Sequence, residues 1–495
     1  MTKAEVAGVV VSHLDKIFLG GSWVGGQGGR QAILSPSTGR PIAEVSLPSA
    51  TQATAAVGTA HEHGLRYWAR TSVADRVAFV RRMCELLEAR LPELGRLWAA
   101  EAGMAVRYSR TLHKFGAAGA WSASLAVAEE ALADQWHKGP MGDVLVRREP
   151  VGVVVGVMAY NGPLVTLATK IIPALLAGCP VVVKAAPESQ LVLRIVAECA
   201  EEAALPPGTL SILCGDAELG RVMTADERVD LVSLTGGQRA AQDIISATAP
   251  RFARTHLELG GKSAALILPD ADLDHALRSL TPGATSGTGQ VCALLTRILV
   301  PQSRYDETVE ALRAAWSRLI VGDPLDPETH LGPLANAAAY DRTERFLAQA
   351  IDEGGEVLVG GRRPPGLDAG WYFEPTIVGN VRRDSYLARN EVFGPITAVM
   401  TYDDLDDGIA LANDTTYGLA ASVYTRDRAA GLECASRIVT GSVGVNAFGP
   451  DVTAPWGGRK GSGWGREGGA EGIHEFTELK QIVLGPGLDD QGAAR

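Results

Sequence analysis

The chain has few cysteines, no recognisable metal-binding motif and no excess of positive charge. Its six cysteines are scattered along 495 residues without a Cys-x-x-Cys pair, so a paired metal or redox site is not expected. The nine histidines form no His-Glu-x-x-His sequence. A formal net charge of −11 argues against a nucleic-acid partner, because binding a phosphate backbone needs concentrated positive charge. We therefore expect neither a metal site nor nucleic-acid binding.

Long hydrophobic runs are also missing. The longest, Val151–Tyr160, is about half the length that a helix needs to span a bilayer. The first eleven residues include Lys3 and Glu5 and offer no usable cleavage site, so no signal peptide is expected. Sparse, unpaired cysteines are typical of a reducing compartment. These features predict a soluble, cytoplasmic protein without a membrane segment.

What the chain does have is length and an α/β pattern. A hydrophobic content of 46%, with 57 glycines and 26 prolines, is typical of a loop-rich enzyme with two or three cores. Short apolar runs alternate with helical periodicity, which predicts parallel sheets with right-handed crossovers and a ligand at the carboxyl ends of the strands. The expected strands are 144–150, 152–157, 180–184, 209–213, 231–234, 263–268, 297–300 and 475–484. The expected helices are 74–97, 115–133, 163–177, 191–204, 238–248, 273–280 and 305–319.

Two short segments carry reactive side chains. Cys292 follows a small-residue turn in Gly289-Gln290-Val291-Cys292, and Glu258 precedes a glycine pair in Leu257-Glu258-Leu259-Gly260-Gly261-Lys262. Covalent catalysis needs such a pair, a thiolate to attack carbon and a carboxylate to activate the water that releases the product. A lone cysteine is more often a small buried hydrophobe, so the assignment depends on the motifs that accompany it.

Further motifs occur in order along the whole chain. They are Asn161 in Ala159-Tyr160-Asn161-Gly162-Pro163-Leu164, Lys184 in Val182-Val183-Lys184, the Glu258 and Cys292 segments, Glu391-Val392-Phe393-Gly394-Pro395, Asn446 in Val445-Asn446, and Pro455-Trp456-Gly457-Gly458-Arg459-Lys460-Gly461-Ser462-Gly463. Together they resemble the aldehyde dehydrogenase superfamily, over essentially the full length of the chain.

The resemblance implies an α/β fold with three parts. A Rossmann-like dinucleotide-binding domain would comprise residues 1–131 and 151–256, and a second α/β catalytic domain would span 257–464. A small β oligomerisation element would combine the hairpin at 132–150 with residues 465–495. A terminal apolar strand is an exposed edge unless it is paired. In the family this strand pairs with a neighbouring subunit. We therefore expect a homodimer or homotetramer.

The resemblance also implies a reaction. Cys292 would attack the aldehyde carbon, while the Asn161 side-chain amide and the Cys292 backbone N–H would hold the oxyanion. After hydride transfer, Glu258 would activate water to hydrolyse the thioester. Lys170 matches a family lysine near the base and would relay its proton; the alternative is a solvated helix lysine.

The implied cofactor is NAD, with NADP possible. The expected contacts are Met158, Ala159, Tyr160, Lys184, Thr235, Gly236, Gly237, Leu259, Glu391 and Phe393. The glycine turn 235–237 would place a helix N-terminus at the pyrophosphate. The chain lacks a Gly-x-Gly-x-x-Gly sequence, which the family does not use. Two departures concern the cofactor: Ala241 replaces a family glycine, and Pro187, followed by Glu188, stands where many NAD-preferring members have a glutamate.

The substrate side differs from many members of the family. Gly162, Thr169 and Ser286 stand where aromatic residues are common. We expect a wide pocket for a bulky, uncharged aldehyde, lined by Gly162, Thr166, Thr169, Ser286, Phe448 and Trp456, with Tyr160 also able to fill space. Because Thr169 is neutral and 446–456 has no basic residue, an anionic substrate is disfavoured. The open alternative is a contribution from Arg107, Arg110 or Arg459.

Three rival functions remain to be weighed. A cofactor-independent cysteine hydrolase or acyltransferase would want a histidine near the thiol, and none follows Cys292 before His330. A CoA-acylating semialdehyde dehydrogenase would lack the water-activating carboxylate, so Glu258 disfavours it. A structural nucleotide-binding protein would not need Cys292, Glu258 and Asn161 together.

Overall fold

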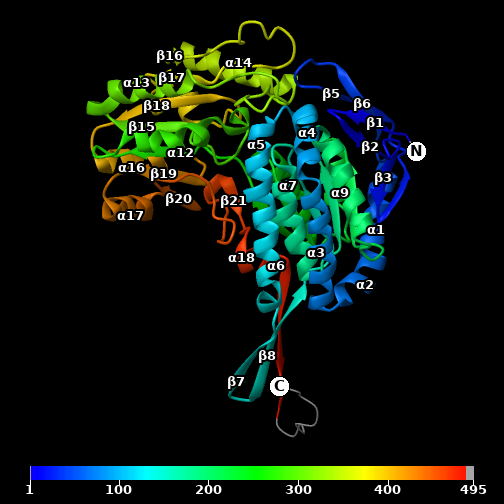
Figure 1. Ribbon diagram of the computed structural model, residues 1–495. Helices are drawn as coiled ribbons and strands as arrows, with labels where there is room; N and C mark the ends of the chain where they lie inside the picture. Colours follow the sequence, from blue (N-terminus) through cyan, green and yellow to red (C-terminus); the bar gives the residue numbers. More distant parts are fainter. Residues whose placement is uncertain (1, 486–495) are drawn as a thin grey trace.

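Two α/β bodies lie side by side, and a narrow β arm projects from one of them (Figure 1). The computed structural model describes residues 2–485. Its main elements are an eight-stranded sheet, a seven-stranded sheet and the three-stranded sheet of the arm. The α/β fold class predicted from the sequence is confirmed. Among the described residues, no helix combines the length and the apolar character needed to cross a membrane.

The eight-stranded sheet has the order β21-β13-β12-β9-β10-β11-β3-β4. Its five central strands are parallel: β9 (Val154–Val157), β10 (Val181–Ala185), β11 (Leu210–Cys214), β12 (Leu231–Thr235) and β13 (Arg254–Glu258). The margins are antiparallel and come from the two ends of the chain: β3 (Lys16–Leu19), β4 (Ser22–Gly25) and β21 (Gly463–Trp464). The sequence pattern predicted four of the five parallel strands and missed β13. It also missed the margin strands, so the expectation of a parallel sheet was wrong at these margins.

The order of the central strands positions the site. From β9 the chain proceeds to β10 and β11 on one side, and then returns to place β12 on the other side of β9. The loops after β9 and β12 therefore leave the sheet in opposite directions. In open α/β sheets a crevice forms at such a reversal, outside the carboxyl ends of the strands.

The helices that cover this sheet agree with the sequence patterns in part. The predicted helix 163–177 is a continuous run of α7 (Pro163–Thr166), the π-helical turn η4 (Leu167–Ile171) and α8 (Ile172–Ala177). Helices α9 (Gln190–Glu202) and α11 (Gln238–Thr248) also lie where expected.

Two helix predictions were wrong in extent. The expected helix 74–97 is two helices, α3 (Val73–Ala89) and α4 (Leu91–Ala102), because Arg90 leaves helical geometry and a proline opens the second helix. The expected helix 115–133 begins earlier, as α5 (Val106–Thr111), the π-helical segment η3 (Leu112–Ala118) and α6 (Gly119–Ala131).

The seven-stranded sheet forms the second body, with the order β16-β17-β18-β15-β14-β19-β20. Every neighbouring pair is parallel except β16 with β17. The strands are β14 (Ala264–Ile267), β15 (Arg297–Pro301), β16 (Glu356–Val359), β17 (Thr376–Gly379), β18 (Ile396–Tyr402), β19 (Ala420–Tyr424) and β20 (Ser442–Val445). Helices α12 (Leu273–Thr285), α13 (Tyr305–Trp316) and α14 (Ala337–Asp352) pack on this body. Helix α12 is longer than predicted and ends at the turn that leads to Cys292.

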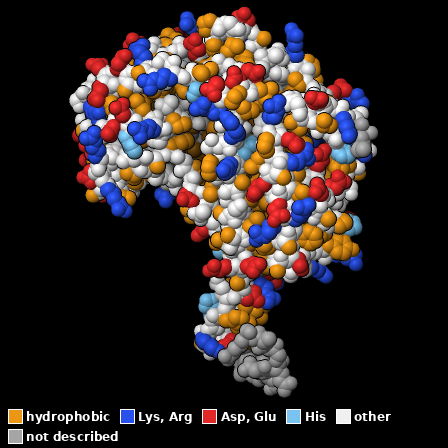
Figure 2. Space-filling view, viewed as in Figure 1, with side chains coloured by type: hydrophobic (Ala, Val, Ile, Leu, Met, Phe, Trp, Pro, Cys, Tyr) orange, Lys and Arg blue, Asp and Glu red, His pale blue; other side chains and the backbone are white. Residues whose placement is uncertain are grey.

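The arm combines β7 (Gln135–Gly139), β8 (Gly142–Pro150) and β22 (Thr477–Val483). The tail strand pairs antiparallel with β8 within the chain, from Thr477 opposite Pro150 to Val483 opposite Val144. Both the hairpin and the tail strand were predicted, but the tail strand was expected to pair with a neighbouring subunit and it pairs instead with β8 of its own chain. The part of the tail at 486–495 lies outside the described residues. On the face shown in Figure 2, acidic and basic side chains are interspersed over the bodies.

Candidate active site

A cavity of about 340 Å³ lies at the carboxyl ends of β9, β12 and β13, where the strand order reverses. It brings together Cys292, Glu258 and Asn161, the three residues predicted to carry the chemistry. Most of the predicted cofactor residues line the same cavity: Ala159, Tyr160, Thr235, Gly236, Gly237, Leu259, Glu391 and Phe393. Met158 and Lys184 do not line it; they lie behind it, with the Met158 backbone N–H donating to the Lys184 carbonyl at 2.9 Å.

The turn that presents Cys292 is tightly constrained. Gly289 has φ +77°, and a Cβ at this position would lie 2.1 Å from the carbonyl carbon of Gly394, so only glycine fits. The Gln290 side-chain oxygen accepts hydrogen bonds from the Tyr160 hydroxyl and the Ala335 backbone N–H, both at 3.1 Å. Because Tyr160 precedes Asn161, this bond ties the cysteine turn to the loop that carries the amide.

The electrostatic surroundings keep the Cys292 thiol protonated. Burial raises the pKa of Cys292 to about 12, and the negative charges of Glu391, Glu258 and Glu467 act in the same direction. The free protein therefore holds a thiol rather than a thiolate at neutral pH. Thiolate formation then depends on a base or on a change in the charge of the cavity.

Glu258 belongs to a buried cluster with Glu467 and Lys170. Burial, and next the charge of Glu467, raise the pKa of Glu258 well above its usual range, while Lys170 opposes the shift. The Lys170 ammonium lies 2.8 Å from a carboxylate oxygen of Glu467, and its side chain is fully buried. The alternative of a solvated Lys170 is therefore wrong. Glu258 Oε1 is buried and has no hydrogen-bond partner among the described residues, so it can accept a proton from a bound water.

Asn161 completes the reactive end of the cavity. It follows β9 and precedes α7, and it is 9% exposed. Within residues 2–485 its side-chain amide forms no hydrogen bond. The amide N–H groups are thus available to an oxygen that develops negative charge in the cavity.

The opposite end of the cavity is built around Glu391 and Phe393. Glu391 accepts a hydrogen bond from the Gly261 backbone N–H at 3.0 Å, and burial raises its pKa to about 7. Phe393 has a positive φ of 53°, which is unusual for a large side chain. Its ring stands edge-on to the ring of Tyr160, with the two ring centroids 6.2 Å apart. Arg342 of α14 stabilises this segment, since its guanidinium donates to the carbonyls of Val392 and Phe393 at 2.8 and 3.1 Å.

Arg342 and Glu467 were missed at the sequence level. Arg342 lines the cavity from α14, and Glu467 approaches it from the segment that follows β21. Neither belongs to a motif with the nucleophile or the base. Only the tertiary fold brings them there.

The residues present fit a dinucleotide. Gly237 forms the N-cap of α11 without a side-chain hydrogen bond, and nothing lies within 4 Å of where its Cβ would be. The first backbone N–H groups of α11 are therefore open to an anion. Ala241 is buried in the core beneath the helix with Leu234 and Ile244, so its methyl group faces the sheet. Glu188 accepts a hydrogen bond from Asn336 at 2.7 Å.

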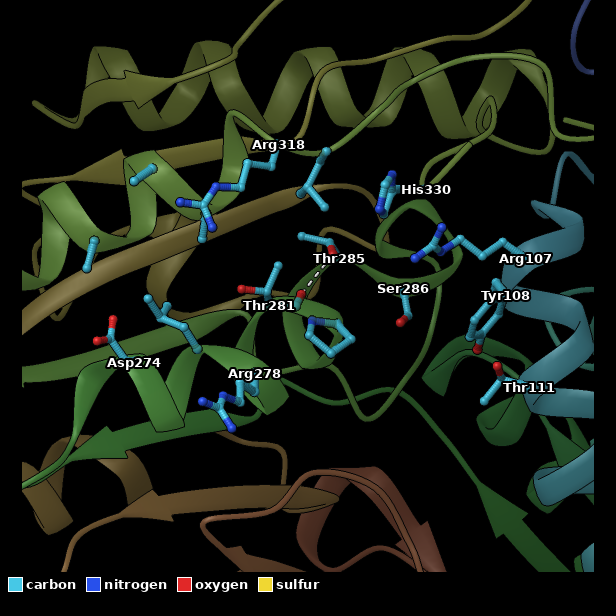
Figure 3. A pocket seen from close by; sticks show the side chains of 16 residues that line it. Arg107, Tyr108, Thr111, Asp274, Arg278, Thr281, Thr285, Ser286, Arg318 and His330 are labelled. Carbon is cyan, nitrogen blue, oxygen red and sulfur yellow. Dashed lines mark hydrogen bonds between the residues drawn. The ribbon is translucent and has the colours of Figure 1, made fainter. Parts of the chain in front are cut away.

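The predicted substrate residues separate into three groups. Phe448 and Trp456 pack with Cys292 against an apolar cluster of Ala293, Leu419 and Ala420. Thr166 and Thr169 lie on the run from α7 to η4 that also carries Lys170, and Gly162 is the N-cap of α7. Ser286 lines an adjoining groove of about 830 Å³, shown in Figure 3.

Comparison with known proteins agrees with this geometry. The model of the aldehyde dehydrogenase family matches residues 23–482. Geranial dehydrogenase of Castellaniella defragrans is 37% identical over 472 residues, which cover 94% of this chain and 98% of that protein. The 3-succinoylsemialdehyde-pyridine dehydrogenase of a Pseudomonas species is 35% identical, with coverage of 94% and 98%.

Solved structures show the same fold. An aldehyde dehydrogenase of Mycobacterium tuberculosis complexed with NAD+ superposes with a TM-score of 0.93 at 37% identity, covering 96% of this chain and 99% of that one. A mutant of aldehyde dehydrogenase C from Pseudomonas syringae, in complex with NAD+ and octanal, gives 0.89 at 33% identity, with coverage of 95% and 97%. The predicted fold class and enzyme class are confirmed, and the chain belongs to the aldehyde dehydrogenase family.

Proposed function

We propose that this protein oxidises a bulky, uncharged aldehyde to the carboxylic acid through a thioester on Cys292, which water activated by Glu258 hydrolyses. The observation that carries the proposal is the convergence of the Cys292 thiol, the Glu258 carboxylate and the Asn161 amide on one cavity. A nucleophile, a base and an oxyanion donor are the three parts that covalent oxidation of an aldehyde requires.

In the first step the Cys292 sulfur forms a bond to the aldehyde carbon and gives up its proton. The Asn161 amide and the Cys292 backbone N–H hold the oxygen that becomes negative. Glu258 and Glu391 are the two carboxylates in the cavity lining, and either can accept the thiol proton. The hydride then leaves the same carbon, which leaves a thioester on Cys292.

In the second step Glu258 removes a proton from water, and the oxygen of that water attacks the thioester carbon. The unpartnered Oε1 of Glu258 is the atom that would accept this proton. The ammonium of Lys170, paired with Glu467, counters the negative charge of the cluster and provides a route for the proton away from the cavity. The carboxylic acid departs and the thiol is restored.

The cofactor is NAD, which accepts the hydride when bound. NAD+ is present in the solved relatives from Mycobacterium tuberculosis and Pseudomonas syringae. Glu391 would hold the nicotinamide ribose, Lys184 the adenosine ribose, and the start of α11 the pyrophosphate. NADP is the alternative cofactor, because Pro187 brings no carboxylate to repel its 2′-phosphate.

The substrate class rests on the character of the walls near the thiol. The cluster around Cys292 is apolar, with Phe448 and Trp456 beside it. A substrate with a carboxylate close to its aldehyde group would need a cation in this wall, and Thr169 is neutral. Burying a carboxylate without a partner is costly. One relative is named for geranial, and a mutant of another holds octanal, and both of these aldehydes are apolar.

Two rivals are disfavoured by the same geometry. No histidine lines the cavity within the described part of the chain, as a cofactor-independent cysteine hydrolase or acyltransferase would require. Glu258 in the cavity favours water over CoA as the acceptor of the acyl group.

The two half-reactions can be separated by Glu258→Gln. This variant should release a burst of NADH, while its steady-state turnover falls by about two orders of magnitude, as expected for loss of a general base. Stopped-flow absorbance at 340 nm measures both phases. Cys292→Ala should show neither phase yet still bind NAD+, whereas Cys434→Ala, in the core of the second body, should retain both. An unchanged steady rate in Glu258→Gln would remove this residue from the mechanism.

A further inference from the structure

A second concave site adjoins the cysteine turn. The groove of about 830 Å³ runs between α5 on one side and α12 and α13 on the other, and Ser286 lies on its floor (Figure 3). Figure 2 shows a hollow between the lobe that carries α12 and α13 and the body that carries α5. None of the three reacting residues, Cys292, Glu258 and Asn161, lines this groove.

The charges of the groove are unbalanced. Arg107, Arg278 and Arg318 line it, against a single carboxylate from Asp274. In the described part of the chain, none of these three guanidinium groups forms an ion pair or a side-chain hydrogen bond. The groove is therefore a local positive region on a protein whose net charge is −11.

His330 adds a neutral donor beside Arg107. Its Nδ1 accepts the Ile320 backbone N–H at 3.2 Å, so the ring proton lies on Nε2. Burial, and next the nearby charge of Arg107, lower the pKa of His330, which leaves the ring neutral at pH 7. Figure 3 shows Arg107, His330 and Ser286 along the same part of the groove.

The groove is in contact with the segment that presents the nucleophile. Ser286 opens the turn that ends at Cys292, and a Cβ on Gly287 would lie 3.5 Å from the Tyr108 ring. Tyr108 itself lines the groove. Burial, and next the charge of Cys292, raise the pKa of Tyr108.

We propose that this groove is an anion-binding subsite that takes a carboxylate or phosphate group, with Arg107 and His330 as the main donors. Arginine binds such groups through two parallel N–H bonds, and a neutral imidazole N–H adds a third. Arg278 and Arg318 extend the positive region along the groove. The anion is either the far end of a long aldehyde, whose reacting end still meets the neutral walls near Cys292 and whose charge departs from the uncharged class proposed above, or a free anion. The first source rests on the proposed function, and the second does not.

The first arm of the test compares matched substrates. A series of ω-oxocarboxylates of increasing length is paired with n-alkanals of the same carbon number, and the ratio of kcat/KM within each pair is measured. In the wild type, we expect kcat/KM of the ω-oxocarboxylate relative to that of the alkanal to rise at one chain length. In Arg107→Gln this ratio should fall about tenfold, the loss expected for a charged hydrogen bond. Arg110→Gln is the control, because Arg110 lies on the same helix, is exposed and does not line the groove.

The second arm measures binding of inorganic phosphate to the NAD+-saturated protein by calorimetry at low salt, where exposed charges are least screened. Phosphate binding that is lost in Arg107→Gln but kept in Arg110→Gln supports the subsite with a free anion as its ligand. If the kcat/KM ratio falls in Arg107→Gln and is kept in Arg110→Gln, the subsite is supported with the far end of the aldehyde as its ligand. If neither quantity differs between the two variants, the proposal is wrong. Failure of the n-alkanals to reduce NAD+ would instead overturn the proposed function. The phosphate measurement would still show whether the groove binds an anion.

Discussion

At the scale of single residues, the protonation of Cys292 governs its reactivity. A pKa raised to about 12 means that the thiolate fraction of the free protein is small at pH 7 and grows about tenfold for each pH unit. The rate of alkylation of Cys292 by iodoacetamide should therefore rise continuously between pH 6 and about pH 10, without levelling off near neutrality. Peptide mass analysis of the alkylated protein assigns the rate to Cys292.

The control for this experiment is Cys292→Ala, in which that reaction should disappear. Glu258→Gln should raise the alkylation rate at neutral pH, because removing a nearby negative charge favours the thiolate. A plateau in the wild-type profile near pH 7 would show that the free cavity already activates the thiol, contrary to this account.

Lys170 should set the pH at which Glu258 works. Its positive charge favours the carboxylate form of Glu258, so Lys170→Met should raise the pKa of Glu258 further. A base must be deprotonated to act, and hydrolysis of the thioester should then need a higher pH. The measurement is the pH dependence of the steady-state rate, which should move by about one unit toward alkaline pH.

The loss of one partner from a buried ion pair also costs stability, about 3–5 kcal/mol. Lys170→Met combined with Glu467→Gln removes both charges and should recover part of the thermal stability. Lys170→Arg keeps the charge and should keep the wild-type pH profile. A normal profile in Lys170→Met would reduce Lys170 to a purely structural role.

The sequence predicted the residues that lie within short motifs and missed those that reach the cavity from distant segments. Cys292, Glu258 and Asn161 each lie in a short local motif: Cys292 follows a turn, Glu258 ends β13 and Asn161 follows β9. Glu467 and Arg342 depend on how the end of the chain and α14 fold back over the cavity, which no local spacing encodes.

At the scale of elements, we expect the run from α7 to η4 to determine how much room an aldehyde has. Gly162 has an extended φ of −169°, which any residue adopts, and an added Cβ would meet only Val165, at 3.7 Å. Gly162→Phe should therefore fold, with its ring placed next to Asn161. The narrower site should lose kcat/KM for a bulky aldehyde such as geranial by about tenfold or more, while acetaldehyde is affected less.

A panel of acetaldehyde, octanal, geranial and succinic semialdehyde, with both NAD+ and NADP+, measures this preference. Gly162→Ala is the matched control and should retain the wild-type order, with the bulky uncharged aldehydes preferred. If acetaldehyde is already the best wild-type substrate, or if Gly162→Phe leaves the order unchanged, the proposed substrate class is wrong.

Local periodicity predicted most of the central elements, and it failed where long-range contacts decide. The three antiparallel margin strands of the first sheet come from the two chain ends, and short strands of this kind acquire their identity only from a neighbour. The break at Arg90 was hidden because the apolar spacing continues across it. The proline that opens α4 was the available signal.

At the scale of the whole molecule, the arm is the feature that a monomer leaves unexplained. It projects away from both bodies (Figure 1), and Trp136, Met141 and Leu479 on it are 57%, 68% and 62% exposed. Exposed apolar side chains on a projecting sheet with a free margin mark an association surface. The sequence likewise predicts that residues 132–150 and 465–495 form an oligomerisation element.

We therefore expect a homodimer or homotetramer, with a mass two or four times the 52.0 kDa of the chain. Light scattering coupled to size exclusion measures this mass. Leu479→Lys combined with Trp136→Lys should shift the protein toward the monomer, because charges would have to be buried in the apolar contact. Ile351→Lys, at an exposed apolar position on α14, is the control and should leave the mass unchanged. A wild-type monomer at micromolar concentration would contradict the assignment of the arm, and an assembly that survives the double substitution would place the contact elsewhere on the molecule.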